Sequence, residues 1–155
     1  MGCSETIVPK PNAFLSLKYP DAFYQNITLD LPFKFDKNKL AIVEGTQYKD
    51  SSQSLNLNYP LLKAKLYLSY HHLNENLNRY VSETEFTTKN HAKVAHEITE
   101  QKFENFRTNV YGKMYELTGP VASQCQFYVT DSSQHFLTGA LYFKVKPNYD
   151  SILPA

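Results

Sequence analysis

Three polar side chains of one short stretch resemble the parts of a hydrolase active site. Asp131, Ser132 and His135 lie in TDSSQHF, and an aspartate, a serine and a histidine can serve as orienting acid, nucleophile and base. That chemistry needs groups that converge from separate elements beside backbone N–H groups that stabilise an oxyanion. Residues of one turn rarely meet this geometry, so we expect Asp131 and Ser132 to bond amides of their own turn. The alternative to this structural role is that the turn serves a small-ligand binder or a hydrolase.

A second reactive position is Cys3, in the opening stretch MGCSET. In a eukaryotic cytosol this stretch fits the M-G-x-x-x-[ST] pattern, with a myristoyl chain on Gly2 and a palmitoyl chain on Cys3. In a bacterium, Gly-Cys-Ser-Glu is typical of a lipoprotein after removal of its signal peptide, with diacylglycerol on the cysteine thiol. The third interpretation is a free cysteine near the terminus. The stretch MGCSET by itself does not decide among these three interpretations of Cys3.

The sequence contains no recognisable metal or cofactor motif. His71 and His72 are adjacent on a predicted strand, so their side chains point to opposite faces and do not share a metal easily. The two cysteines, Cys3 and Cys125, have neither the spacing of a zinc site nor the number needed for a disulfide framework. Glycine-rich phosphate loops, G-x-S-x-G and H-E-x-x-H are absent from the sequence. We therefore expect no catalytic residue, no metal and no cofactor.

The composition favours one sheet-rich domain. A length of 155 residues suits a single domain with a buried core, and 12 Tyr and 10 Phe without Trp favour strands. The net charge of +1 argues against a dedicated nucleic-acid binder. No apolar run approaches the roughly 20 residues that span a bilayer, and no apolar export signal follows Met1. Either the protein is cytosolic, or a signal peptide has been removed, in which case cleavage falls just before Cys3.

Alternation of side chains predicts the clearest strand over residues 61–70. Apolar residues stand at every second position from Leu62 to Tyr70, which predicts one buried and one solvated face. The helix candidate follows at about residues 75–91, with Asn74 as its N-terminal cap. Four further strand-like stretches with short turns predict an antiparallel meander. They are residues 96–105, 109–119, 124–131 and 135–147.

The remaining segments complete the predicted architecture. Strands are also expected at residues 13–20, 24–35 and 39–45, and a polar loop at residues 46–54. Residues 1–12 are predicted to be a tether, and residues 13–155 a single α+β domain, mainly antiparallel sheet with one internal helix. One short helix covers little of a sheet, and the last nine residues begin as a capped helix would. We therefore expect a C-terminal covering helix that is missing from this chain.

The run QFYVTDSSQHFLTGALYF, from Gln126 to Phe143, resembles the end of the gliding-motility lipoprotein family GldD. The stretches VPKP, FLSLKYP, PFKFDKN, NYPLLKAKLYLSY and EQKFEN follow the family order, so the resemblance covers nearly the whole chain. Leu31-Pro32 stands where family members often have Cys-Pro, so a family disulfide at that position is absent. Family members continue past the position of Ala155 into a C-terminal helix, in agreement with the expectation above.

The resemblance implies a function for Cys3 and for the domain. Cys3 is then the lipid attachment site of a mature lipoprotein that is anchored in the cell envelope and faces the periplasm. Family members are needed for gliding motility and associate with the type IX secretion apparatus, and no enzymatic activity is established for them. The expected role is a non-catalytic accessory or docking component with other gliding and secretion envelope proteins as partners. By analogy of element order, the expected fold is a PsbP/Mog1-like α-β-α sandwich.

Overall fold

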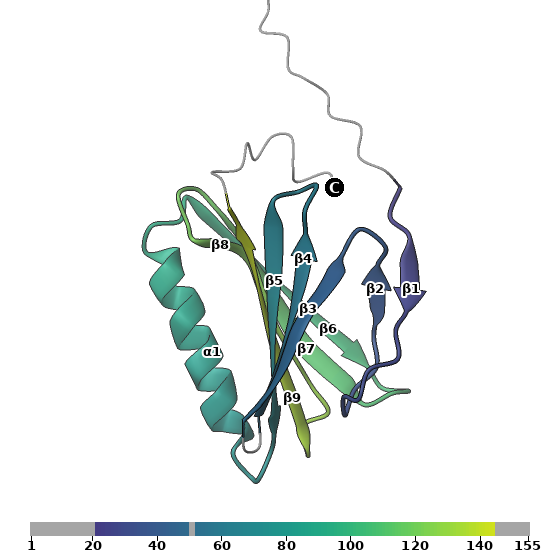
Figure 1. Ribbon diagram of the computed structural model, residues 1–155. Coiled ribbons are helices and arrows are strands. Elements are labelled where there is room, and N and C mark those ends of the chain that lie inside the picture. Colours follow the sequence, from purple (N-terminus) through teal and green to yellow (C-terminus); the bar gives the residue numbers. More distant parts are fainter. Residues whose placement is uncertain (1–20, 50–51, 145–155) are drawn as a thin grey trace, which may run out of the picture.

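A computed structural model describes residues 21–49 and 52–144. Its elements are β1 (Tyr24–Asn26), β2 (Asp36–Asn38), β3 (Ile42–Lys49), β4 (Ser52–Tyr59), β5 (Ala64–His72), α1 (Leu77–Ala92), β6 (Glu97–Asn105), β7 (Val110–Thr118), β8 (Ser123–Thr130) and β9 (His135–Phe143). Seven strands form one sheet in the order β3-β4-β5-β9-β8-β7-β6, and β1 pairs with β2 in a separate ribbon. Helix α1 lies on one face of the sheet and the β1–β2 ribbon on the other (Figure 1). The predicted α+β fold, mainly antiparallel sheet with one internal helix, is confirmed.

The strands after the helix form the predicted meander. β6, β7, β8 and β9 pair with one another in chain order, and β9 then pairs with β5 along its whole length. In β5 the alternation is also confirmed, because Ala64, Leu68 and Tyr70 are buried while Tyr67 on the other face is exposed. Local periodicity therefore identified the middle of the sheet correctly.

The predicted loop at residues 46–54 is wrong. Residues 46–49 belong to β3 and residues 52–54 to β4, and the two strands pair in antiparallel fashion up to Lys49 and Ser52. β4 buries Leu55 and Leu57 on one face and carries polar side chains on the other, which a half-solvated sheet tolerates. At Gly45, with a φ of +60°, the pairing register shifts, and glycine suits such a bulge because this φ strains other residues.

The predicted strand over residues 24–35 is mostly wrong. Only β1 at its start is a strand, and the following residues cross the sheet face opposite α1 without pairing. Leu29, Leu31 and Phe35 pack there on the core cluster of Ala41, Leu55, Leu57 and Leu68. Burial of these apolar side chains outweighs strand pairing. The predicted strand at residues 13–20 and the C-terminal residues 145–155 lie outside the described residues.

The start of α1 differs from the expected one. Asn76, not Asn74, is the N-cap residue, and its side-chain oxygen accepts the N–H of Asn74 at 3.0 Å. Glu75 has a φ of +56°, which is incompatible with a helix, so α1 begins two residues later than predicted. The described residues contain α1 as their one helix, so the second helical layer of an α-β-α sandwich stays a prediction.

Candidate functional site

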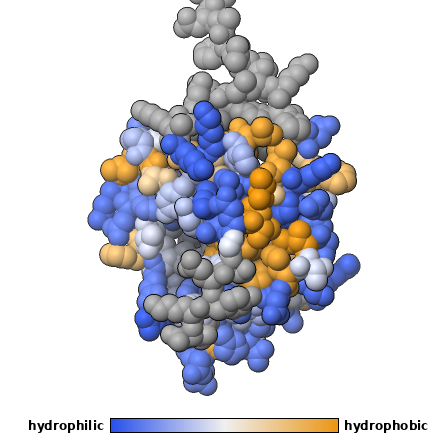
Figure 2. Space-filling view, viewed as in Figure 1, coloured by the Kyte–Doolittle hydropathy of each residue, from blue (hydrophilic) through white to orange (hydrophobic). Residues whose placement is uncertain are grey.

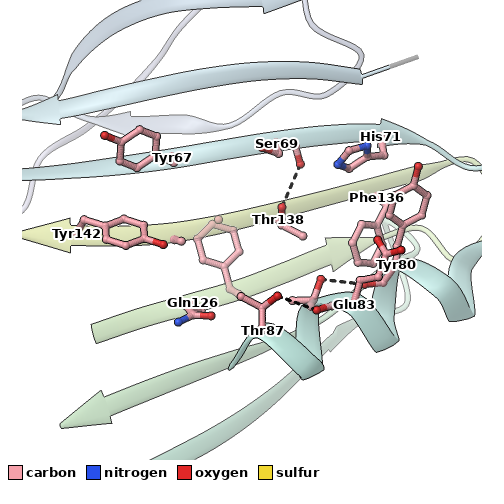
Figure 3. A pocket seen from close by; sticks show the side chains of 14 residues that line it. Tyr67, Ser69, His71, Tyr80, Glu83, Thr87, Gln126, Phe136, Thr138 and Tyr142 are labelled. Carbon is pink, nitrogen blue, oxygen red and sulfur yellow. Dashed lines mark hydrogen bonds between the residues drawn. The ribbon is translucent and has the colours of Figure 1, made fainter. Parts of the chain in front are cut away.

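A cleft lies between α1 and the sheet, and we call it the helix-side cleft. Its volume is about 640 Å³. In Figure 3 the lining side chains of β5 and β9 form two rows that face those of the helix. The lining residues are Tyr67, Ser69, His71, Tyr80, Glu83, Thr84, Thr87, Gln126, Phe127, Phe136, Thr138, Gly139, Ala140 and Tyr142.

Stacked rings form one end of the helix-side cleft. Phe136, which is fully buried, stacks on Tyr80 of α1 and on Tyr128 of β8, with ring centroids 5.5 Å apart in both pairs. His71 stacks on the same Tyr80 at 4.6 Å. Burial lowers the pKa of His71, although Glu83 opposes this shift, so the environment favours the neutral imidazole. The stack fixes the first half of α1 against β5 and β9.

Two tyrosines form the other end of the helix-side cleft. The rings of Tyr67 and Tyr142 meet edge to face at 5.5 Å (Figure 3). The ammonium of Lys65 lies 5.5 Å from the Tyr67 ring and is paired with Glu44 at 2.8 Å. The lining therefore offers aromatic surface and hydroxyl groups, an arrangement that suits recognition of a partner more than acid–base chemistry.

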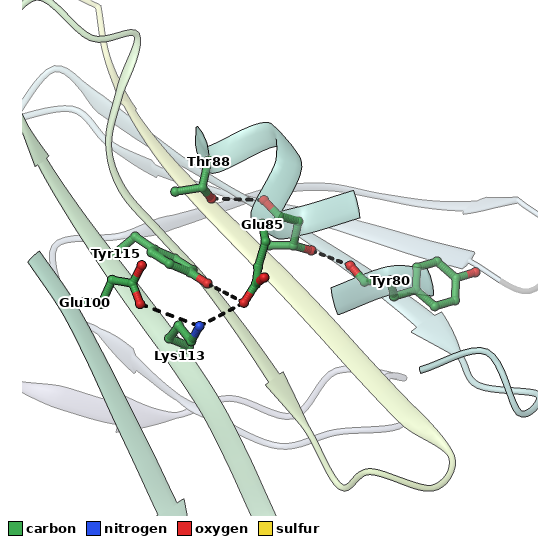
Figure 4. A network of polar contacts seen from close by, with 7 residues as sticks. Tyr80, Glu85, Thr88, Glu100, Lys113 and Tyr115 are labelled. Carbon is green, nitrogen blue, oxygen red and sulfur yellow. Dashed lines mark hydrogen bonds and ion pairs between the residues drawn. The ribbon is translucent and has the colours of Figure 1, made fainter. Parts of the chain in front are cut away.

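A polar network joins α1 to β6 and β7 beside the cleft (Figure 4). The Glu85 carboxylate accepts hydrogen bonds from Lys113 at 2.8 Å and from the Tyr115 hydroxyl at 3.3 Å. Lys113 also lies 3.6 Å from Glu100. The bond from Lys113 lowers the pKa of Glu85, and the bond to Glu85 raises that of Lys113. These opposite shifts keep Glu85 and Lys113 charged as a pair at physiological pH. Burial raises the pKa of Tyr115 to about 12, so its hydroxyl stays protonated and donates to Glu85.

The end of the helix is held by buried polar groups. Thr88, which is buried, lies 3.0 Å from the side-chain oxygen of Gln126, and the Gln126 amide nitrogen contacts His91. The Thr88 hydroxyl also lies 3.0 Å from the carbonyl of Thr84, one turn earlier. Buried polar groups that are paired in this way specify one position of the helix on the sheet.

The turn that contains Asp131, Ser132 and His135 is built around the carboxylate. One oxygen of Asp131 accepts the backbone N–H groups of Ser133, Gln134 and His135 at 2.8–3.0 Å. Burial alone raises the pKa of Asp131, but these hydrogen bonds outweigh it and bring that pKa to about 2. Ser132 has a φ of +67°, and its N–H donates to the Thr130 hydroxyl. The carboxylate thus does what the sequence predicted of a turn former.

The His135 ring belongs to a different set of contacts. Its Nδ1 lies 2.8 Å from the Tyr70 hydroxyl, and its ring meets that of His72 edge to face. The recorded contact between Asp131 and His135 is to the backbone N–H, not to the ring. The structure therefore brings the three residues into one turn but does not align them as acid, base and nucleophile.

A second cavity lies on the opposite face of the sheet, under the segment from β1 to β2, and we call it the apolar cavity. Its volume is about 560 Å³. Phe33, Phe35, Leu57, Leu66, Leu68 and Phe127 supply much of its apolar lining, and Lys34, Asp36, Lys37, Asp131 and His135 also border it. Sequence reasoning missed this cavity and its buried lysine, because no local signal in the sequence marks Lys37 as buried.

The surface carries an apolar region beside the edge of the sheet. Figure 2 shows a band of apolar side chains over the β3 side of the molecule. The exposed apolar side chains include Ile42 at the start of β3 and Leu61 in the turn between β4 and β5, which are 55% and 73% exposed. No helix within the described part of the chain has the length and apolar character required to cross a bilayer. Cys3 lies outside the described residues.

Comparisons with known proteins give one family. The family model described as gliding motility lipoprotein GldD matches residues 4–155. No curated protein and no solved structure matches the chain.

Proposed function

Because the chain belongs to the gliding motility lipoprotein family GldD, we propose that it is a non-catalytic accessory component of the gliding machinery, linked to type IX secretion. The family match carries this proposal and confirms the resemblance read from the Gln126–Phe143 run. Membership implies a role in gliding motility and a membrane-anchored place in the cell envelope. The finer statements, namely the periplasmic orientation, the docking role and the partner proteins, are the content of the proposal.

Cys3 is the proposed attachment point. It stands in Gly-Cys-Ser-Glu immediately before the matched residues 4–155, as expected of a lipidated first residue of a mature lipoprotein. Each methylene of an attached acyl chain that enters the bilayer contributes about 0.8 kcal/mol, so two or three chains anchor stably. Residues 4–12 then act as a tether, and residues 13–155 as one domain that reaches its partners from the membrane.

Three surfaces support docking as the role of this domain. The helix-side cleft offers aromatic rings and hydroxyls, and the apolar band near Ile42 offers hydrophobic contact area. The strands β3 and β6 are the edges of the sheet, where backbone groups are available for pairing. Asp131, Ser132 and His135 stay candidates for contact residues, because their turn is rigid and partly exposed. Other gliding and secretion proteins of the envelope are the proposed partners.

The decisive experiment compares wild type with Cys3→Ala in gliding cells that lack their own copy. We expect wild-type protein in the membrane fraction, with Cys3 carrying added lipid mass in mass spectrometry. The variant should be released from the membrane and should not restore gliding. Crosslinking from both strains should recover type IX components with the wild type alone. A Cys3 that lacks lipid mass would refute the anchor, and a lipidated protein that gliding does not need would refute the motility role.

The hydrolase alternative has a separate test. His135→Ala removes the imidazole but keeps the backbone N–H that Asp131 accepts, so the turn should persist. We expect both the wild type and this variant to show only background turnover of a test ester. Turnover of a test ester by the wild type that His135→Ala abolishes at unchanged thermal stability would replace the non-catalytic proposal with an enzymatic one.

A further inference from the structure

We propose that the apolar cavity binds a single hydrocarbon chain with an anionic head group, and that Lys37 supplies the counter-charge. This inference does not depend on the proposed function. The cavity lies between the segment that follows β1 and the strands β4, β5, β8 and β9. Its volume of about 560 Å³ is within the range of roughly 300–1,000 Å³ that is typical of small-molecule sites.

The lining selects a ligand body without hydrogen-bonding groups. Within the covering segment Phe33 packs against Phe35 at 5.9 Å, and it also packs against Tyr70 of β5 at 5.7 Å. Leu68 and Phe127 belong to the core cluster on the sheet side. Aromatic and aliphatic surfaces of this kind gain free energy by contact with hydrocarbon and offer little to a polar ligand.

Packing of a hydrophobic core does not explain why the side chain of Lys37 is buried. The residue is 7% exposed, and its ammonium donates to the backbone carbonyls of Asn38 and Ala41. An ammonium has three N–H donors. Within residues 21–49 and 52–144, no carboxylate forms an ion pair with the ammonium of Lys37. A buried charge without a counter-ion is unfavourable, whereas a carboxylate or phosphate head group would neutralise it.

The other charged groups that border the cavity are less suited than Lys37 to bind an anionic head group. Asp36 accepts a hydrogen bond from Asn26 at 3.1 Å, and Asp131 is held by the amides of its own turn. The His135 ring is bonded to Tyr70. Lys34 is exposed and adds a second positive charge to the lining. Because both carboxylates have partners of their own, Lys37 is the group along this cavity that is suited to an anion at the end of an apolar chain.

Competition between matched ligands tests the proposal on the full-length, delipidated protein. Displacement of dansylaminoundecanoate should report laurate binding at least about tenfold tighter than dodecanol, because only laurate has the anionic head. Lys37→Met should remove this preference by weakening laurate, with dodecanol unchanged. Lys39→Met, at an exposed lysine of the same segment, is the matched control and should bind as the wild type does. Equal affinities for laurate and dodecanol in the wild type, or an unchanged preference in Lys37→Met, would overturn the role of the lysine.

A tryptophan reporter keeps the test valid if Lys37→Met folds poorly. The chain has no Trp, so Phe33→Trp would place a single fluorophore at the cavity wall, and Tyr67→Trp would place one in the helix-side cleft. We expect laurate to shift the emission of the first variant only. Absence of a saturable shift with laurate and with lauroyl-lysophosphatidate would overturn the site. A response to only one of them would identify a free fatty acid or a lysophospholipid as the source of the chain.

Discussion

The ring of Phe127 lies against Gly139, its cross-strand partner between β8 and β9. A Cβ atom at Gly139 would lie 2.2 Å from Cζ of Phe127. The ring fills the space that a side chain at Gly139 would occupy and reaches the core cluster that contains Leu68. This pair therefore stands at the centre of the seven-stranded sheet, where the meander joins β5.

The first prediction concerns this contact. Gly139→Ala should lower the free energy of unfolding by about 1–3 kcal/mol, because the added methyl group displaces the Phe127 ring. Phe127→Leu in the same chain should recover part of that loss, since the ring that clashes is gone. Urea unfolding of the two single variants and the double variant measures the coupling. Additive losses would show that the contact does not matter.

The second prediction separates a half-buried ion pair from an exposed one of equal length. Glu85→Gln should cost about 1 kcal/mol, because Lys113, whose side chain is 14% exposed, would keep its charge without its closest carboxylate. Glu83→Gln breaks the 2.8 Å pair with Arg79, which is largely solvated, and should not change stability measurably. Thermal unfolding at low ionic strength compares the two variants. Equal effects would contradict the structural role of the Glu85 network.

The third prediction concerns acid stability. The pKa of Asp131 is about 2 in the folded protein against an ordinary value of 3.8, so its carboxylate stabilises the fold above pH 3.8. That contribution is lost as the pH falls from 3.8 towards 2. Asp131→Asn should therefore be less stable than the wild type by about 1–2 kcal/mol at pH 7, with a smaller difference at pH 2.5. Urea unfolding at both pH values checks this, and a difference that does not depend on pH would refute it.

The fourth prediction concerns the thiol of Cys125. Burial raises its pKa to about 11 from 9.0, and Glu116 adds to the shift. The folded state thus favours the protonated thiol, and this contribution to stability is complete below pH 9 and disappears as the pH rises towards 11. In a Cys3→Ser variant, reaction of Cys125 with Ellman's reagent at pH 8 should be slow in buffer and fast in urea. Equal rates in the two solvents would show that the thiol is accessible.

The prediction from sequence was best where the pattern was local. The alternation that ends at Tyr70 identified β5, and the turns between strands identified the meander from Glu97 to Phe143. The interpretation of Asp131 as a turn former also rests on neighbours within four residues, which its hydrogen bonds confirm. The strands at residues 46–49 and 52–54 were not predicted, because backbone pairing between them compensates for a sequence with few apolar residues.

The Glu85 network and the apolar cavity could not be predicted from the sequence, because the residues that form them are distant along the chain. Glu85 and Lys113 are 28 positions apart, and neither residue type indicates by itself that they meet. Lys37 becomes a buried cation only when the segment after β1 folds over the sheet. Periodicity and turn chemistry specify one element at a time, whereas these contacts depend on how elements pack.

By itself the sequence determined the α+β class, the meander of the last four strands, the turn at Asp131 and the family to which the chain belongs. Each of these is encoded in side chains that are close together along the chain or in a continuous run of residues. Only the tertiary structure decided which face α1 covers, which charges are paired, and where the two cavities lie. Those features arise from burial and pairing between distant segments, and their free energy exists only once the sheet is assembled.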